Sequence, residues 1–103
     1  MDRAKFLAAL SAEGVPGSGG YGVMNKDDYV SGLAKSKHFL KIYGEKRLKE
    51  WLDSNHSLPQ NDKLCEQAVW FGQTMLLAER TKMDQIAEAI RKIQEHAADL
   101  AKA

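Results

Sequence analysis

Residues 81–100 read TKMDQIAEAIRKIQEHAADL, and this stretch decides the fold class because it carries the clearest periodic pattern of the chain. Thr81 and Asp84 form a capping-box pattern that predicts the start of a helix. The pairs Glu88–Lys92 and Arg91–Glu95 are expected on its solvent side. Its apolar residues recur at alternating spacings of three and four, which places them on one face: Met83, Ile86, Ile90, Ile93, Ala97 and Leu100.

The segment before this helix predicts a strand that follows another helix. Val69-Trp70-Phe71-Gly72 is typical of a brief buried strand, because β-branched and aromatic residues precede a glycine. So short an apolar run also fits the end of a helix. Further upstream, Asn61 is expected to cap a helix. The inner side of that helix would carry Leu64, Cys65 and Ala68.

The amino-terminal part predicts helices separated by a glycine-rich loop. Asp2 can cap a helix over residues 3–13, which Gly14 would end in the left-handed conformation. Residues 17–22, GSGGYG, predict a loop or an irregular edge strand. Asn25 resembles the cap of a short second helix.

Residues 35–54 have helical apolar spacing that Gly44 interrupts, which predicts one broken helix or two short ones. The part from Lys35 to Arg47 also combines five cations with Phe39 and Tyr43, the composition of a nucleic-acid surface. Helical spacing favours a different interpretation, in which both aromatic side chains anchor the core and the cations cover the solvated side. A third interpretation also stays open, in which some of these cations bind a phosphate-bearing ligand.

The composition predicts one small domain over residues 1–103. The chain is 44% hydrophobic, and its 15 lysines and arginines against 14 acidic residues give no field that would attract nucleic acid or an anionic membrane. Cys65 is the only cysteine, which excludes an internal disulfide and suits a reducing compartment. No signal-like start and no apolar run of roughly 20 residues are present. We therefore expect a soluble, cytoplasmic protein with no nucleic-acid or membrane partner.

The glycine spacing, the histidines and the cysteine do not predict a functional site. Gly17, Gly19 and Gly22 match the spacing G-x-G-x-x-G, but no long buried strand precedes them and no helix follows directly, which favours a structural loop. The histidines lie far apart and lack the spacing of metal ligands, so no metal site is expected. They are His38, His56 and His96. Cys65 is interpreted as a small hydrophobic residue rather than a nucleophile.

The lysines do not predict a covalent cofactor site. A lysine that forms a Schiff base must lose its proton readily, which requires a desolvated or cation-rich pocket. Every lysine here lies in a polar or helix-surface context, and neither an acid for a pyridinium nitrogen nor a phosphate cup is visible. The residues alone thus predict an α/β domain without a self-sufficient active site, and no catalytic or cofactor-binding residue is assigned.

Diffuse motifs over nearly the whole chain resemble the carboxy-terminal small domain of the DegT/DnrJ/StrS sugar aminotransferases, which belong to the aspartate-aminotransferase superfamily of pyridoxal-phosphate enzymes. Each motif is weak by itself, and together they are fairly specific. The residues that carry the resemblance are 5–10 (KFLAAL), 13–16 (EGVP), 20–22 (GYG), 58–59 (LP), 68–71 (AVWF) with Gln73, Leu76 and Leu77, and 86–93 (IAEAIRKI).

The resemblance implies a fold of class α/β (α+β), a small helix-rich domain with helices packed on a short antiparallel sheet. In the family this domain packs against a large domain that holds pyridoxal phosphate, usually in a homodimer. The large domain is not in the sequence, so the chain is expected to bind no cofactor by itself. The strand that begins the family's small domain is also expected to be missing, which would leave an unpaired edge and favour self-association.

The family's segment that resembles residues 21–26 approaches the substrate, which makes Tyr21 and Asn25 the candidate substrate-binding residues. The family commonly has a histidine where this chain has Met24-Asn25, and loop packing plus a helix cap is an equally good interpretation of the two residues. The implied parent enzyme transfers an amino group from an amino acid to a keto sugar or a related cyclic ketone. The alternative is an independent interaction module that binds a protein or nucleic acid through residues 35–47 or the final helix.

Overall fold

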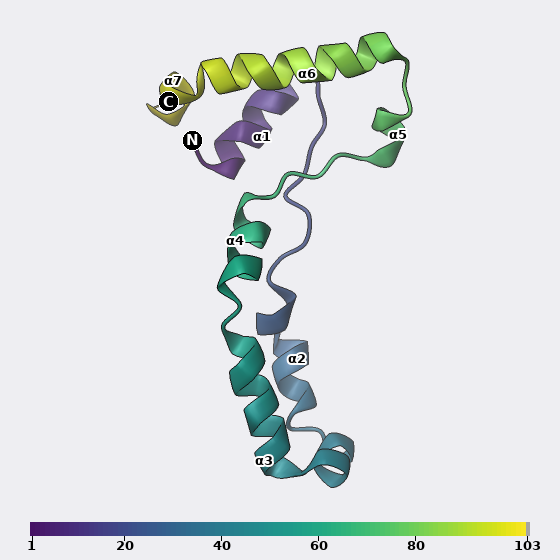
Figure 1. Cartoon of the computed structure of the whole chain (residues 1–103), viewed down its shortest axis with the longest axis vertical. Helices are drawn as coiled ribbons and strands as arrows, with labels where there is room; N and C mark the ends of the chain where they lie inside the picture. Colours follow the sequence, from purple (N-terminus) through teal and green to yellow (C-terminus); the bar gives the residue numbers. More distant parts are fainter. Residues whose placement is uncertain (103) are drawn as a thin grey trace. The chain divides into compact units, whose positions relative to one another are not determined.

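The computed structural model describes residues 1–102, and its secondary structure consists of helices joined by loops and extended segments (Figure 1). It consists of two compact units, a terminal unit (residues 1–20 and 66–102) and a middle unit (Tyr21–Cys65). The elements in chain order are α1 (Arg3–Ala12), the 3-10 helix η1 (Met24–Lys26), α2 (Asp28–Leu33), α3 (Lys37–His56), α4 (Pro59–Gln67), α5 (Gln73–Leu76), α6 (Arg80–Glu95) and α7 (Ala97–Lys102).

The prediction of an antiparallel sheet is wrong. Within residues 1–102 the only paired extended residues are Ser18 and Trp70, which form an isolated antiparallel bridge. The glycines on both sides of Ser18 have no side chains to pack on a neighbouring strand, and Gly72 ends the apolar run on the other side. The helices of the terminal unit therefore pack against each other rather than on a sheet.

The core of the terminal unit lies where α1 crosses α6 (Figure 1). Its buried residues are Leu10, Val15, Ala89 and Ile93, and Ile86, Ile90 and Leu100 are among the partly buried residues around them. The apolar stripe predicted for residues 83–100 thus faces this core. Burying four aliphatic side chains and half-burying their neighbours removes apolar surface from water, which is the main source of stability here.

The local details of α6 differ from the expectation. The helix begins at Arg80 with Glu79 as its N-cap residue, so the capping box at Thr81 is wrong by two positions. The Lys92 ammonium binds the Glu13 carboxylate of the loop after α1, at 2.7 Å, instead of Glu88. The backbone also breaks at His96, and α7 follows as a separate helix.

The predicted start of α1 at Arg3 is confirmed, and the helix ends at Ala12, one residue before the predicted end. The Asp2 carboxylate accepts a hydrogen bond from the Lys5 backbone N–H at 2.9 Å, which satisfies one of the unpaired donors at the helix start. Gly14 has φ +77°, the left-handed conformation that a residue without Cβ adopts at low cost.

In the middle unit the predicted break of the long helix is confirmed and the predicted caps are wrong. Gly44 interrupts α3 with φ +76° and ψ 158°. The N-cap of α2 is Asp27, whose side chain accepts from the Tyr29 backbone N–H, and Asn25 lies in η1 instead. The helix α4 begins at Pro59, so Asn61 stands inside it and caps nothing.

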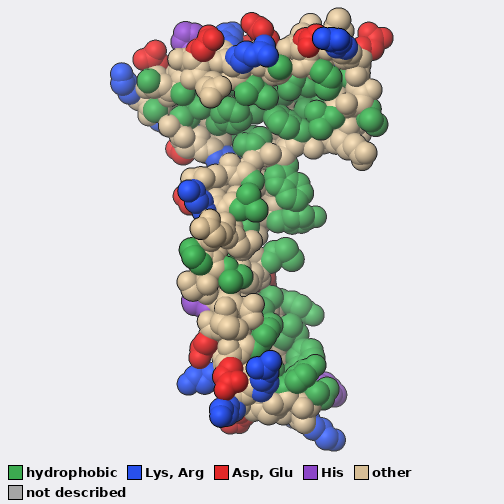
Figure 2. All heavy atoms as spheres, viewed as in Figure 1, with side chains coloured by type: hydrophobic (Ala, Val, Ile, Leu, Met, Phe, Trp, Pro, Cys, Tyr) green, Lys and Arg blue, Asp and Glu red, His purple; other side chains and the backbone are tan. Residues whose placement is uncertain are grey.

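The middle unit has very little core. Leu48 is its only buried hydrophobic residue within the described chain. Figure 2 shows hydrophobic side chains gathered along one side of this unit. The large exposed ones are Tyr21, Met24, Tyr29, Ile42, Tyr43, Leu58 and Leu64. The terminal unit also exposes large apolar residues, Met1, Trp70, Leu76 and Leu77, but it has a buried cluster that the middle unit lacks. In residues 1–102 no helix has both the length and the apolar composition needed to cross a membrane.

Candidate functional site

The two candidate substrate-binding residues have different environments in the middle unit. Tyr21 is 67% exposed at the start of the unit. Asn25 is half-buried in η1, where its Nδ2 donates to the Asn55 carbonyl at 2.7 Å and its Oδ1 accepts from Asn61 Nδ2 at 2.9 Å. The structure therefore gives Asn25 a bracing role between the end of α3 and the start of α4, and it leaves Tyr21 at the surface.

A polar cluster surrounds Asn25 and joins η1 to α4. The next residue, Lys26, forms an ion pair of 2.7 Å with Asp62 Oδ2. The other oxygen of that carboxylate, Oδ1, is buried without a hydrogen-bond partner among the described residues. Cys65 Sγ lies 3.5 Å from the Gly22 carbonyl oxygen and 3.9 Å from Asn61 Oδ1. These bonds hold the short η1 turn, which could not be stable by itself, against two helices.

The cluster has limited capacity for a ligand. An amide nitrogen has two protons and the oxygen two lone pairs, and Asn25 already uses one of each. Its remaining donor and acceptor can bind a hydroxyl group, which is the chemistry of a sugar. The inner face predicted for α4 is only partly correct, because Cys65 is half-buried but Leu64 is 63% exposed.

The sequence favours Phe39 and Tyr43 as core anchors within residues 35–47, and the structure differs from this interpretation. Phe39 is half-buried, and its ring centroid lies 6.0 Å from that of Tyr43. Tyr43 is 55% exposed, however, and its neighbour Ile42 is also exposed. The cations of this stretch, Lys35, Lys37, Lys41, Lys46 and Arg47, are all exposed. Tyr43 is thus a surface residue of a basic segment, and the prediction that it anchors the core is wrong.

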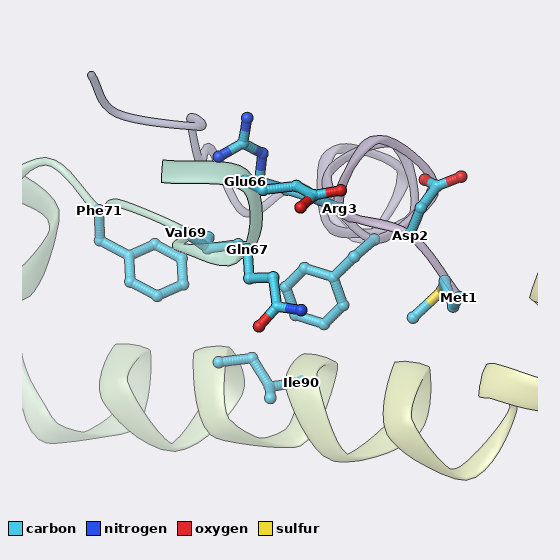
Figure 3. A pocket seen from close by; sticks show the side chains of 9 residues that line it. Met1, Asp2, Arg3, Glu66, Gln67, Val69, Phe71 and Ile90 are labelled. Atoms are coloured by element: carbon cyan, nitrogen blue, oxygen red, sulfur yellow. The ribbon is translucent and has the colours of Figure 1, made fainter. Parts of the chain in front are cut away.

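The terminal unit contains a groove that sequence reasoning missed. The hollow has a volume of about 540 Å³, and Figure 3 shows Phe71 on the extended segment and Ile90 on α6 pointing into the space between these two elements. We call it the terminal groove. Its apolar lining residues are Met1, Phe6, Val69, Phe71 and Ile90, and its polar ones are Asp2, Arg3, Glu66 and Gln67. Only folding brings these residues together, since the three segments lie about 20 to 80 positions apart.

Arg3 connects one side of this groove to the glycine-rich loop. Its Nη1 donates to the Gly19 carbonyl at 3.0 Å and to the Ala68 carbonyl at 3.3 Å. The neighbouring Gly20, at φ +67°, packs so closely on the Trp70 indole that a Cβ would overlap it. These contacts hold the loop and the segment 68–72 in place beside α1.

The histidines of the chain lie on its surface. His38, His56 and His96 are all exposed. Within residues 1–102 no three side chains of the metal-ligating types come close enough to share an ion.

Comparison of the chain with protein-family models, with curated proteins and with solved structures gave no match.

Proposed function

We propose that this chain works as a partner-dependent, non-catalytic domain, and that its partner is the cofactor-bearing domain of a pyridoxal-phosphate-dependent sugar aminotransferase. One observation carries the first half of the proposal: seven large apolar side chains of the middle unit stay exposed while Leu48 alone is buried there. Exposed apolar patches of this kind mark surfaces that pack against another protein. The family motifs named above support the second half.

The lysines support a division of labour between this chain and its partner. Pyridoxal phosphate needs a lysine whose amine gives up its proton in a desolvated pocket. The lysines of residues 1–102 are all at least partly exposed, and Lys26 and Lys92 form ion pairs with carboxylates at 2.7 Å. Lys5, the most covered of them, donates to the Ala101 carbonyl. These residues do not fit the cofactor, so the partner domain would supply it.

The role of the chain itself would be positioning and exclusion of water. A domain that closes over a bound substrate holds it near the reacting group and removes competing water. Asn25, with one donor and one acceptor unused, would offer hydrogen bonds to sugar hydroxyls, and the side chain of Tyr21, which is 67% exposed, would contact the sugar. The proposal assigns no bond-making step to either residue.

The proposal is tested by adding the purified chain to the isolated large domain of a sugar aminotransferase of this family. We expect a one-to-one complex in sedimentation, and an increase in the rate at which glutamate bleaches the yellow bound cofactor. Replacement of Ile42 and Tyr43 by serine should weaken the complex, whereas Lys102→Ser, which changes an exposed residue of the terminal unit, should not. Failure of the wild-type chain to bind any such large domain would overturn the proposal.

A second function is favoured by the exposure of Tyr43 within the basic segment 35–47. An exposed aromatic ring among five cations can stack on a base while the cations contact phosphates. If single-stranded nucleic acid is the partner, a labelled dT oligonucleotide should bind with an affinity that falls steeply with salt, and Tyr43→Ala should weaken binding more than Tyr29→Ala. Binding that is absent at low salt would contradict this second function.

A further inference from the structure

The extended segment 68–72 is paired on one side only. The Trp70 backbone N–H donates to the Ser18 carbonyl at 2.8 Å, and the Ser18 N–H donates back to the Trp70 carbonyl at 3.0 Å. Two residues that exchange both bonds form the hydrogen-bonded type of antiparallel pair. In this geometry the N–H and C=O groups of the flanking residues, Val69 and Phe71, point away from Ser18.

These outward groups have no partner in the described part of the chain. No hydrogen bond joins the backbone of Val69 or Phe71 to another group of residues 1–102. Backbone donors and acceptors of this kind form a ready template for a further strand. The segment is also held firmly, since Arg3 binds the Ala68 carbonyl and Gly20 packs on Trp70. A rigid template lowers the entropy lost when a strand is added.

The same residues line the terminal groove. Val69 and Phe71 contribute their side chains to it, together with Phe6 and Ile90 (Figure 3). A strand that bonds to the outer edge places every second side chain on the face that holds this groove. Its volume of about 540 Å³ has room for two aliphatic side chains.

The charges at the rim indicate which strand would fit. Glu66 lines the groove and makes no ion pair among the described residues, and the carboxylate of Asp2 lies on the same rim. The Arg3 guanidinium is engaged by the Gly19 and Ala68 carbonyls. A basic side chain would therefore find an available acidic partner at Glu66, whereas an acidic one would be repelled.

We propose that the terminal groove binds an extended, basic peptide segment of a partner protein, which adds as a strand to the backbone of Val69 and Phe71 and inserts alternate apolar side chains beside Phe6 and Ile90. This inference goes beyond the proposed function, and it concerns the terminal unit rather than the exposed surface of the middle unit. The two can fail separately, because strand addition needs no cofactor domain.

The test uses the full chain and the fluorescently labelled peptide KTVTVTV, with its amino end acetylated and its carboxyl end amidated, in which the lysine and the valines share one face. Fluorescence anisotropy should show saturable binding that weakens with salt. The same peptide with N-methyl groups on alternate residues, placed in either register, should bind about tenfold more weakly because it cannot complete the ladder. The acidic peptide ETVTVTV should also bind more weakly.

Variants of the chain separate the backbone edge from the groove. Phe71→Pro removes the outward N–H, and Phe71→Leu is its matched control because it keeps that donor and an apolar side chain. We expect the proline variant to bind the peptide at least about tenfold more weakly than the leucine variant. Glu66→Gln should reduce the preference for the basic peptide. Circular dichroism checks that the proline and leucine variants fold. If the proline variant does not fold, the N-methylated peptides still test the backbone edge on the wild-type chain.

Three results would overturn the proposal. One is the absence of saturable binding, and another is equal binding of the methylated and unmethylated peptides in both registers. The third is a self-association of the chain that excludes the peptide, since a second copy rather than a partner protein would then occupy this edge. Methylation-sensitive, charge-selective binding with the wild-type chain supports it.

Discussion

The terminal and middle units are both helical, but they are held together in different ways. In the terminal unit α1 packs on α6 and buries Leu10, Val15, Ala89 and Ile93 in one cluster. In the middle unit only Leu48 is buried, and a polar cluster around Asn25 connects its segments. Because apolar burial is the dominant favourable term in folding, we expect the middle unit to open first and to gain most from a partner.

The largest effect is expected from a substitution in the core of the terminal unit. Leu10 is fully buried, so Leu10→Ala leaves a cavity and should lower the free energy of unfolding by about 2–5 kcal/mol. Leu64→Ala removes the same atoms from an exposed position of the middle unit and should change it by less than about 0.5 kcal/mol. Urea unfolding followed by circular dichroism measures both. Similar losses for the two variants would mean that the units do not differ in this way.

The next effect tests the backbone of the middle unit. Gly44 has φ and ψ values that only glycine adopts easily, so Gly44→Ala should destabilise this unit by about 1–3 kcal/mol. Gly32 is helical with open space at its Cβ position, so Gly32→Ala should stabilise it by about 0.5–1 kcal/mol. Hydrogen exchange of the α2 and α3 amides reads out both changes. A pair of shifts with the same sign would argue against the bend at Gly44.

The polar cluster should contribute less than the core. Asn25→Ala removes the bonds to the Asn55 carbonyl and from Asn61, and should cost about 1–2 kcal/mol. Asn55→Ala keeps the backbone carbonyl that Asn25 uses, and its smaller effect serves as the control. Faster exchange is expected in the middle unit only. If exchange in α1 and α6 rose equally, the two units would unfold together.

The smallest effect compares two ion pairs of equal length. Lys26 pairs with Asp62 in the middle unit and Lys92 pairs with Glu13 in the terminal unit, each at 2.7 Å. Both pairs are partly exposed, so Lys26→Met and Lys92→Met should each cost less than about 1 kcal/mol. The cost should shrink in high salt because of screening. Thermal melts at low and high salt measure it, and a loss that salt does not change would point to packing of the lysine stems instead.

Local signals in the sequence predicted local structure well. The Asp2 cap, the left-handed Gly14 and the break at Gly44 all depend on a few neighbouring residues, and all three are confirmed. The capping box at Thr81 fails by two positions, since helix ends depend on small differences in free energy that neighbouring contacts can reverse.

The candidate site was harder to predict because its bonds are not local. Asparagine is a residue type that often caps helices, which is how the sequence suggests Asn25. Its hydrogen-bond partners Asn55 and Asn61 lie 30 and 36 residues further along the chain. The terminal groove joins residues of α1, the segment 66–71 and α6, and no single stretch of sequence carries its signal. The only sequence signal for the groove is the apolar character of Met1, Phe6, Val69, Phe71 and Ile90.

The sequence by itself determined that residues 83–100 present one apolar face, that α1 spans the first segment and that glycines end or bend the helices. Those features follow from spacing and from the steric freedom of single residues. Only the tertiary structure decided that no sheet forms in residues 1–102, that Tyr43 stays exposed and that Lys92 pairs with Glu13. Pairing and burial are set by which distant segments meet, and that depends on the free energy of the whole fold rather than on any local pattern.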